Sequence, residues 1–144
     1  LSGNELLVEP WLAYGGDTTL AGYGGQELSA IPQSHQDFLA NCHQWCETED
    51  HFFVHASYRP DLPLADLPGS VLRWESLRDD LPGPHYSGKI AVAGHTAQRS
   101  GQILDLTYLK CIDTCCYGEG CLTAMDVASG QLWQADKEGR IIED

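Results

Sequence analysis

Basic residues are scarce in this sequence. Lys and Arg total 8 against 21 Asp and Glu, which gives a formal net charge of -13. Nucleic acids and anionic membranes are both bound through basic surfaces, so we expect neither as a partner. The acidity itself is typical of a well-solvated protein. It leaves phosphate chemistry open, because bound metal ions can supply the positive charge that the side chains lack.

Long apolar runs and targeting signals are also missing. No apolar stretch reaches the roughly 18 residues that a membrane span requires, and no basic segment precedes an apolar one as in a secretory signal. Six cysteines occur, two of them adjacent at Cys115 and Cys116. Without a secretory signal, this pattern favours reduced thiols in a cytoplasmic protein over disulfides. A length of 144 residues predicts a single domain, residues 1–144.

A structural zinc site built on these cysteines is the alternative. Cys111, Cys115, Cys116 and Cys121 cluster in the chain, and their spacings are Cys-x-x-x-Cys and Cys-x-x-x-x-Cys. Structural zinc sites more often show tight Cys-x-x-Cys pairs. Buried thiol packing is therefore the favoured interpretation.

The first third of the chain predicts two helices. Asp17 can cap a short helix over residues 18–23 that Gly24 ends. Ser34 can cap a second helix, in which apolar residues recur with the 3.6-residue period at Phe38, Leu39, Cys42, Trp45 and Cys46. The four tryptophans fall on apolar patterns, which places them in the core. They are Trp11, Trp45, Trp74 and Trp133.

The rest of the chain predicts mostly strands. Residues 51–55 and 89–93 form two short apolar stretches, separated by a Pro-rich loop and a brief helix around Trp74 and Leu77. Four further strands, with a turn at Ser129-Gly130, resemble an antiparallel meander; they cover residues 103–106, 109–114, 122–127 and 132–135. Helices alternating with buried strands, followed by strands alone, predict an α/β layered fold with a mixed sheet.

Two histidines stand where apolar strands end. His55 closes the first strand and His95 follows the second, with Gly94 allowing close backbone approach. If the strands are parallel neighbours, both imidazoles meet beyond the carboxyl ends of the sheet. Neutral imidazole is a common ligand of Zn, Mn and Fe. The pattern therefore predicts a metal site at His55 and His95, to which Asn4 can add an amide oxygen.

Five short motifs, in order, resemble the calcineurin-like metallophosphoesterases, and within them the bacterial protein serine/threonine phosphatases. Phe53-Val54-His55-Ala56 resembles the Val-His-Ala-Gly segment, and Gly94-His95-Thr96 resembles the Gly-His-Thr motif. Ser2-Gly3-Asn4-Glu5 resembles the Gly-Asn-His-Glu motif without its histidine. The remaining similarity lies in residues 11–24 and in Ile112-Asp113-Thr114 with the segment that follows.

The resemblance implies a layered sandwich whose sheet edge holds two divalent metals, Mn, Fe or Zn, that activate a hydroxide to attack phosphorus. Asn4, His55 and His95 match three ligands of one metal. The implied function is a metal-dependent hydrolase acting on phosphomonoesters, in a phosphorylated protein or a small molecule. Arg59 and Arg99 are candidates for binding the substrate phosphate, because a guanidinium suits phosphate oxygens.

The departures from the family are equally specific. Its Asp-x-His and Gly-Asp-x-x-Asp-Arg motifs are absent and would precede Leu1, so we expect the N-terminal part of the fold to be missing. The catalytic histidine that should follow Asn4 is also absent. Three neutral ligands offset none of the repulsion between two cations, so we expect at most one metal. A non-catalytic relative that acts as a binding module, with an edge strand open to self-association, and a dinucleoside tetraphosphatase are the alternatives.

Overall fold

The computed structural model describes residues 8–142, which form two compact units divided between His43 and Gln44. Each unit is described by itself. Among the residues described, no helix is long and apolar enough to cross a membrane. Asn4, one of the three predicted metal ligands, lies outside the described residues.

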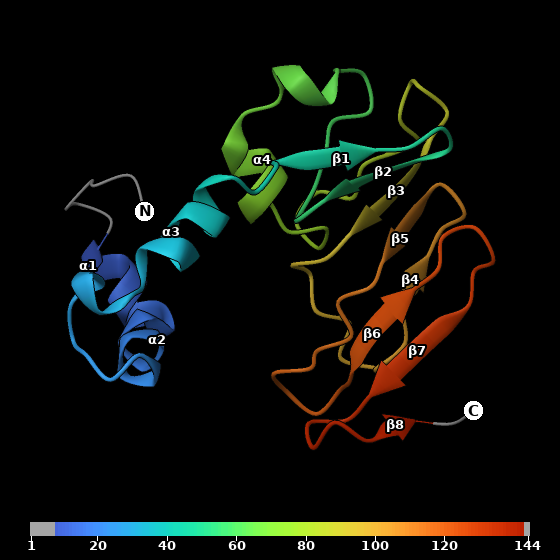
Figure 1. The fold of residues 1–144 in the computed structure, drawn as a ribbon. Helices are drawn as coiled ribbons and strands as arrows, with labels where there is room; N and C mark the ends of the chain where they lie inside the picture. The colour runs from blue at the N-terminus through green and yellow to red at the C-terminus, as the bar shows by residue number, and fades with distance from the viewer. Residues whose placement is uncertain (1–7, 143–144) are drawn as a thin grey trace. The chain divides into compact units, whose positions relative to one another are not determined.

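The first unit is helical (Figure 1). Its elements are α1 (Val8–Trp11), η2 (Leu12–Gly16), α2 (Asp17–Gly22), η3 (Leu28–Ala30) and α3 (Gln33–Ala40). A kink interrupts η2 at Gly15, whose φ of 100° is a conformation that glycine adopts without steric cost. The predicted helix at residues 18–23 is confirmed as α2. The predicted cap was wrong, because Gly16 stands at the N-cap and Asp17 is the first residue of the helix. The Asp17 carboxylate accepts a hydrogen bond of 2.7 Å from the Thr18 amide.

The second predicted helix is confirmed only in its first part. It ends at Ala40, and Pro32 rather than Ser34 stands at its N-cap. Trp45 and Cys46, which continued the helical period, instead belong to a strand that pairs with residues 53 and 54. The prediction was wrong there because strand pairing distant in sequence overrides local periodicity.

A five-stranded sheet forms the larger part of the second unit. Its strands are β1 (Trp45–Glu47), β2 (His51–Val54), β3 (Ile90–Ala93), β4 (Leu104–Asp105) and β5 (Leu109–Cys111), in the order β1-β2-β3-β5-β4. The three central strands β2, β3 and β5 run parallel, and the two edge strands run antiparallel to their neighbours. The predicted strands at residues 51–55 and 89–93 are confirmed as parallel neighbours.

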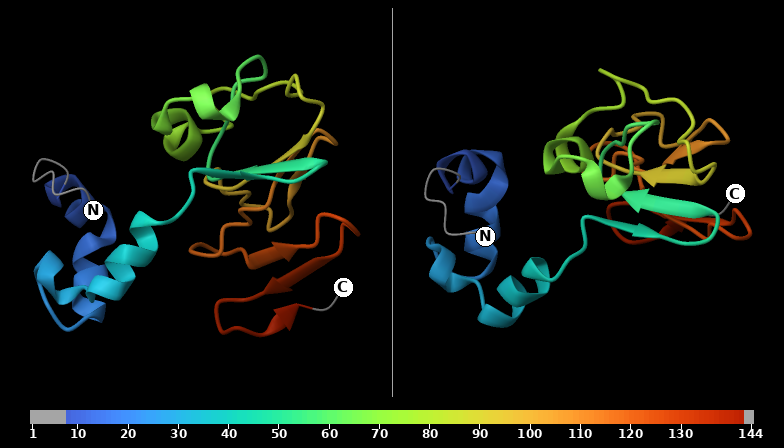
Figure 2. Two further views of the ribbon diagram at one scale, coloured as in Figure 1. Left: turned by 45° about the horizontal axis from the view of Figure 1, so that its top comes forward. Right: turned by 90° about the horizontal axis from the view of Figure 1, so that it is seen from above.

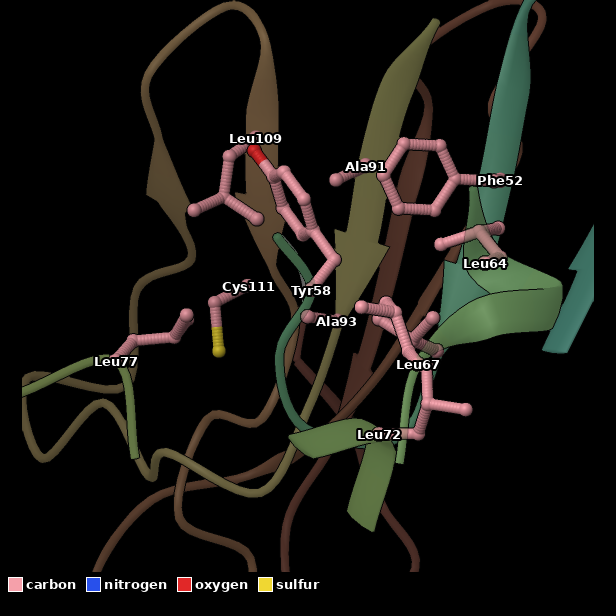
Figure 3. Packing of buried hydrophobic residues seen from close by; sticks show 11 residues of the cluster. Phe52, Tyr58, Leu64, Leu67, Leu72, Leu77, Ala91, Ala93, Leu109 and Cys111 are labelled. Atoms are coloured by element: carbon pink, nitrogen blue, oxygen red, sulfur yellow. The ribbon is translucent and has the colours of Figure 1, made fainter. Parts of the chain in front are cut away.

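The connection from β2 to β3 covers one face of this sheet. It contains η4 (Leu64–Asp66) and α4 (Gly69–Trp74). Figure 3 shows how apolar side chains from this connection meet those of the central strands. Phe52, Tyr58 and Leu72 are fully buried in this cluster. The Phe52 and Tyr58 rings pack edge to face at 5.0 Å. The main core therefore lies directly beneath the parallel strands.

The last strands form a separate three-stranded sheet, visible in the left view of Figure 2. It consists of β6 (Leu122–Met125), β7 (Leu132–Ala135) and β8 (Ile141–Ile142), the last of which was not predicted. The expected single meander is wrong, because β5 pairs in parallel with β3 and joins the first sheet. The α/β prediction is confirmed at the coarser level of a mixed five-stranded sheet with a second, smaller sheet.

Candidate metal site

His55 and His95 come together beyond the carboxyl ends of β2 and β3. The two strands are in parallel register, with Phe53 opposite Val92, and the Gly94 amide donates a hydrogen bond of 2.9 Å to the His55 carbonyl. This pairing brings the imidazole centroids to 5.1 Å, with the ring planes tilted by 57°. The predicted convergence of the two side chains is therefore present in the structure.

The backbone at His95 adopts a conformation that is rarely populated. Its φ is 60°, and the Thr96 amide donates to the Gly94 carbonyl across it. A bond from residue i+2 to residue i around a central residue of positive φ is the strained form of the γ-turn. Such strain persists only where the surroundings enforce it, and it concentrates at functional sites.

A backbone carbonyl sets the tautomer of His95. Its Nε2 lies 3.1 Å from the Trp74 carbonyl oxygen, which can only accept a hydrogen bond. Nε2 must therefore carry the proton, and a neutral His95 has its lone pair on Nδ1. Metal-binding histidines usually donate their other ring N–H to a carbonyl or carboxylate in this way.

Two further hydrogen bonds hold the end of α4 against the strand ends. The Leu77 amide donates to the buried Thr96 hydroxyl at 2.9 Å, and the Ala56 amide donates to the Leu72 carbonyl at 2.8 Å. Trp74 lies between these attachment points. Its indole is 74% exposed and meets the His95 ring edge to face at 6.2 Å. The prediction that Trp74 is a core residue was wrong.

The surroundings of His55 favour its neutral form. Partial loss of hydration lowers its pKa, and so do the charges of His95 and Arg73, whereas Asp113 opposes the shift. A lowered pKa favours the neutral imidazole at pH 7, which is the form that binds metal ions.

Asp113 and Arg73 were not predicted as site residues. Asp113 follows β5, the third parallel strand, in the same way that the two histidines follow theirs. The position of Asp113 beyond the carboxyl end of a parallel strand would have marked it as a site residue. Residues 109–114 were expected in an antiparallel meander, so this position was not recognised. Arg73 is an exposed residue in the last turn of α4, and no sequence pattern marked it.

The two predicted phosphate-binding arginines differ in their surroundings. Arg59 is half-buried and forms ion pairs with Glu75 at 2.7 Å and Asp80 at 3.5 Å. Its guanidinium is thus held by carboxylates. Arg99 is exposed, and its side chain makes none of the hydrogen bonds or ion pairs found among residues 8–142. Both roles in substrate binding stay predictions.

The spacing of the rings fits a shared divalent ion. A metal bonded to an imidazole nitrogen at about 2.1 Å lies about 3.2 Å from the ring centroid, so a tetrahedral ion sets two centroids about 5.2 Å apart. The observed 5.1 Å agrees with this value. Within residues 8–142, however, no group of three or more His, Cys, Asp or Glu side chains is placed to hold a metal. The donors that fit are therefore two neutral nitrogens.

The cysteines are free thiols, and Cys115 and Cys121 are neighbours in an isolated β-bridge. Cys111 Sγ lies against the carbonyls of Gly94 and Thr96, and Cys121 Sγ lies against the Thr114 hydroxyl. All six thiols are unpaired. The zinc alternative thus has no preformed set of ligands in the described part of the chain.

Comparison of the chain with models of known protein families, and with curated proteins, gives no match.

Proposed function

We propose that this chain carries one metal-binding half of a phosphoesterase site, most like that of a bacterial serine/threonine protein phosphatase. The observation that carries the proposal is the His55–His95 pair, whose 5.1 Å spacing suits one divalent ion. The layered metallophosphoesterase sandwich is part of the same proposal. Two sheets in one compact unit, with the histidines beyond the parallel strand ends, are compatible with it.

The chain's own residues have distinct tasks in this scheme. His55 and His95 hold the metal, and the Trp74 carbonyl orients the His95 ring through Nε2. A divalent ion held there would supply Lewis-acid polarisation and would lower the pKa of a bound water. Arg73 is the arginine whose charge reaches His55. Arg59, which is ion-paired, and Arg99 stay candidates for binding phosphoryl oxygens, and Arg73 is a third.

The alternative is a relative that binds a metal without catalysis. Two neutral nitrogen donors leave the charge of even one cation uncompensated, and two ions a few Å apart would repel strongly. This donor set favours occupancy by one metal, whereas the dimetal mechanism needs two. The two hypotheses differ in turnover and agree on metal binding.

Hydrolysis of p-nitrophenyl phosphate with and without added Mn²⁺ tests the proposal. One bound ion can still polarise a phosphoryl oxygen as a Lewis acid, so we expect slow turnover that depends on Mn²⁺. It should fall by about 100-fold or more in His55→Ala and in His95→Ala, because loss of an outer partner alone costs about 10- to 100-fold. His43→Ala is the matched control, since His43 is an exposed histidine of the other compact unit. It should keep wild-type turnover.

The outcomes separate the hypotheses. Turnover that persists without metal, or that survives in either site variant, contradicts the proposal. Mn²⁺ binding without any turnover supports the non-catalytic alternative. Equal loss in His43→Ala would show that the substitutions act through folding, and the assignment of the site would then fail.

A further inference from the structure

Asp113 occupies the third position along the edge where the two histidines lie. β3 and β5 are parallel neighbours with Ala93 opposite Cys111. His95 and Asp113 each come two residues after their strand, so they stand at the same level of the sheet. Gly94, the residue before His95, lies close to Asp113, because a Cβ built at Gly94 would be 3.9 Å from the Asp113 Cβ. Asp113 therefore lies at the strand end next to the one that carries His95, close enough for its charge to act on His55.

The surrounding loop fixes Asp113 in place. Its Oδ1 accepts a hydrogen bond of 3.1 Å from the Cys115 amide, and its carbonyl accepts one of 2.7 Å from the Gln98 amide. Cys115 itself has a φ of 64°, a left-handed conformation that a non-glycine residue rarely adopts. One backbone amide thus holds the carboxylate, and a second holds the backbone of the same residue.

Asp113 also has no cationic partner among the described residues. The six ion pairs found in residues 8–142 use other carboxylates, those of Glu47, Glu75, Asp80, Asp105, Glu119 and Asp136. The partly buried carboxylate of Glu75, at the end of α4, is paired in this way with Arg59. A fixed, half-buried carboxylate without a counter-charge is available to a bound cation.

The charge balance of the site calls for such a group. Two neutral imidazoles compensate none of the charge of a divalent ion, and the nearby Arg73 adds a positive charge. Asp113 is the carboxylate whose field reaches His55. A divalent ion is held more strongly when an anionic group lies near it, even when that group does not belong to the preformed ligands.

We propose that Asp113 is the anionic partner of a divalent cation bound by His55 and His95. This inference rests on the metal-binding part of the proposed function and does not depend on catalysis. Asp113 acts through its negative charge, because within residues 8–142 no three such side chains are already gathered as ligands. The proposed site therefore consists of two imidazole nitrogens that bind the cation and one nearby carboxylate.

Titration of the full chain with Mn²⁺, followed by calorimetry, tests this inference. We expect Asp113→Asn to weaken Mn²⁺ binding by about 10- to 100-fold. The asparagine keeps an oxygen that accepts the Cys115 amide, so the loop should be retained. Asp126→Asn is the matched control. The Asp126 carboxylate, beside the smaller sheet, accepts a hydrogen bond of 2.9 Å from the Ala128 amide, two residues further on, as the Asp113 carboxylate does from the Cys115 amide. It should bind as the wild type does.

Two further measurements distinguish charge from structure. Asp113→Glu keeps the negative charge and should bind Mn²⁺ more tightly than Asp113→Asn. The difference between wild type and Asp113→Asn should also shrink between about 0.05 M and about 0.5 M salt, because salt screens a charge interaction. A difference that is independent of salt, with Glu no better than Asn, would overturn the assignment.

The remaining outcomes are equally decisive. Wild-type affinity in Asp113→Asn would overturn this inference alone and leave the His55–His95 proposal standing. A wild-type chain that binds no Mn²⁺ would overturn both. If Mn²⁺ binding is intact in both Asp113 variants but lost in His55→Ala, the histidines alone bind the ion and the role assigned to Asp113 is wrong.

Discussion

The five-stranded sheet buries an apolar face beneath α4, whereas the one buried side chain in the described strands of the three-stranded sheet is the polar Thr123. Phe52, Leu72 and Leu109 are fully buried in the first. In the second, Thr123 is buried and the Gln134 amide donates to its hydroxyl at 2.9 Å and to the Gly101 carbonyl at 3.0 Å. The two sheets of one unit therefore depend on different interactions.

The opposite face of the smaller sheet is apolar and exposed. Strand pairing places Leu122, Ala135 and Ile141 in one row and Ala124 beside Trp133 in the next, so these five share a face. Leu122 is 63% exposed and Ile141 is 65% exposed. Side chains that remain in contact with water contribute little hydrophobic stabilisation. Stability should thus be concentrated in the five-stranded sheet, which also carries the histidines.

Leu→Ala substitutions in the two sheets should give the largest contrast. Leu72 is fully buried in α4, so Leu72→Ala should lower the free energy of unfolding by about 2 to 5 kcal/mol. Leu122→Ala removes the same atoms from an exposed position and should change it by less than about 0.5 kcal/mol. Urea denaturation followed by circular dichroism measures both. Equal effects would contradict the comparison.

Tyr58 should give a smaller effect that depends on pH. It is fully buried and its hydroxyl donates to the Gly83 carbonyl at 2.7 Å. Burial raises its pKa to about 12, with a further contribution from Tyr108. Because the unfolded tyrosine ionises first, at its ordinary value of 10.0, the stabilisation is complete below pH 10 and is lost as the pH rises toward 12.

Tyr58→Phe should remove both the hydrogen bond and this pH dependence. We expect a loss of about 1 kcal/mol at neutral pH and a smaller difference from wild type at pH 11. Tyr117→Phe is the control, since Tyr117 is 80% exposed. Urea denaturation at the two pH values is the measurement. A difference from wild type that grows with pH would contradict the raised pKa.

The sequence predicted the strands that carry the histidines, because both are apolar stretches closed by turn residues. It did not reveal which strands pair. The pattern of apolar and polar residues along β5 is the same whether its neighbour is parallel or antiparallel. Its place beside β3 could therefore not be inferred. β1 has only three residues, too few to show a period, and Trp45 was assigned to the preceding helix instead.

The candidate site was predictable to the same extent. His55 and His95 were found because each ends an apolar strand. Asp113 was missed because its importance depends on the parallel pairing of β5 with β3. The carbonyl of Trp74 has no sequence signal at all, since any residue has a backbone oxygen; its role follows from where α4 ends.

The most direct test of the account is a crystal structure of the chain grown with Mn²⁺, with diffraction data collected on both sides of the manganese absorption edge. The account predicts one anomalous peak within bonding distance of Nδ1 of His95 and of a ring nitrogen of His55, with Asp113 beside it. A map without a peak at this pair, or with manganese bound elsewhere in the chain, would contradict it.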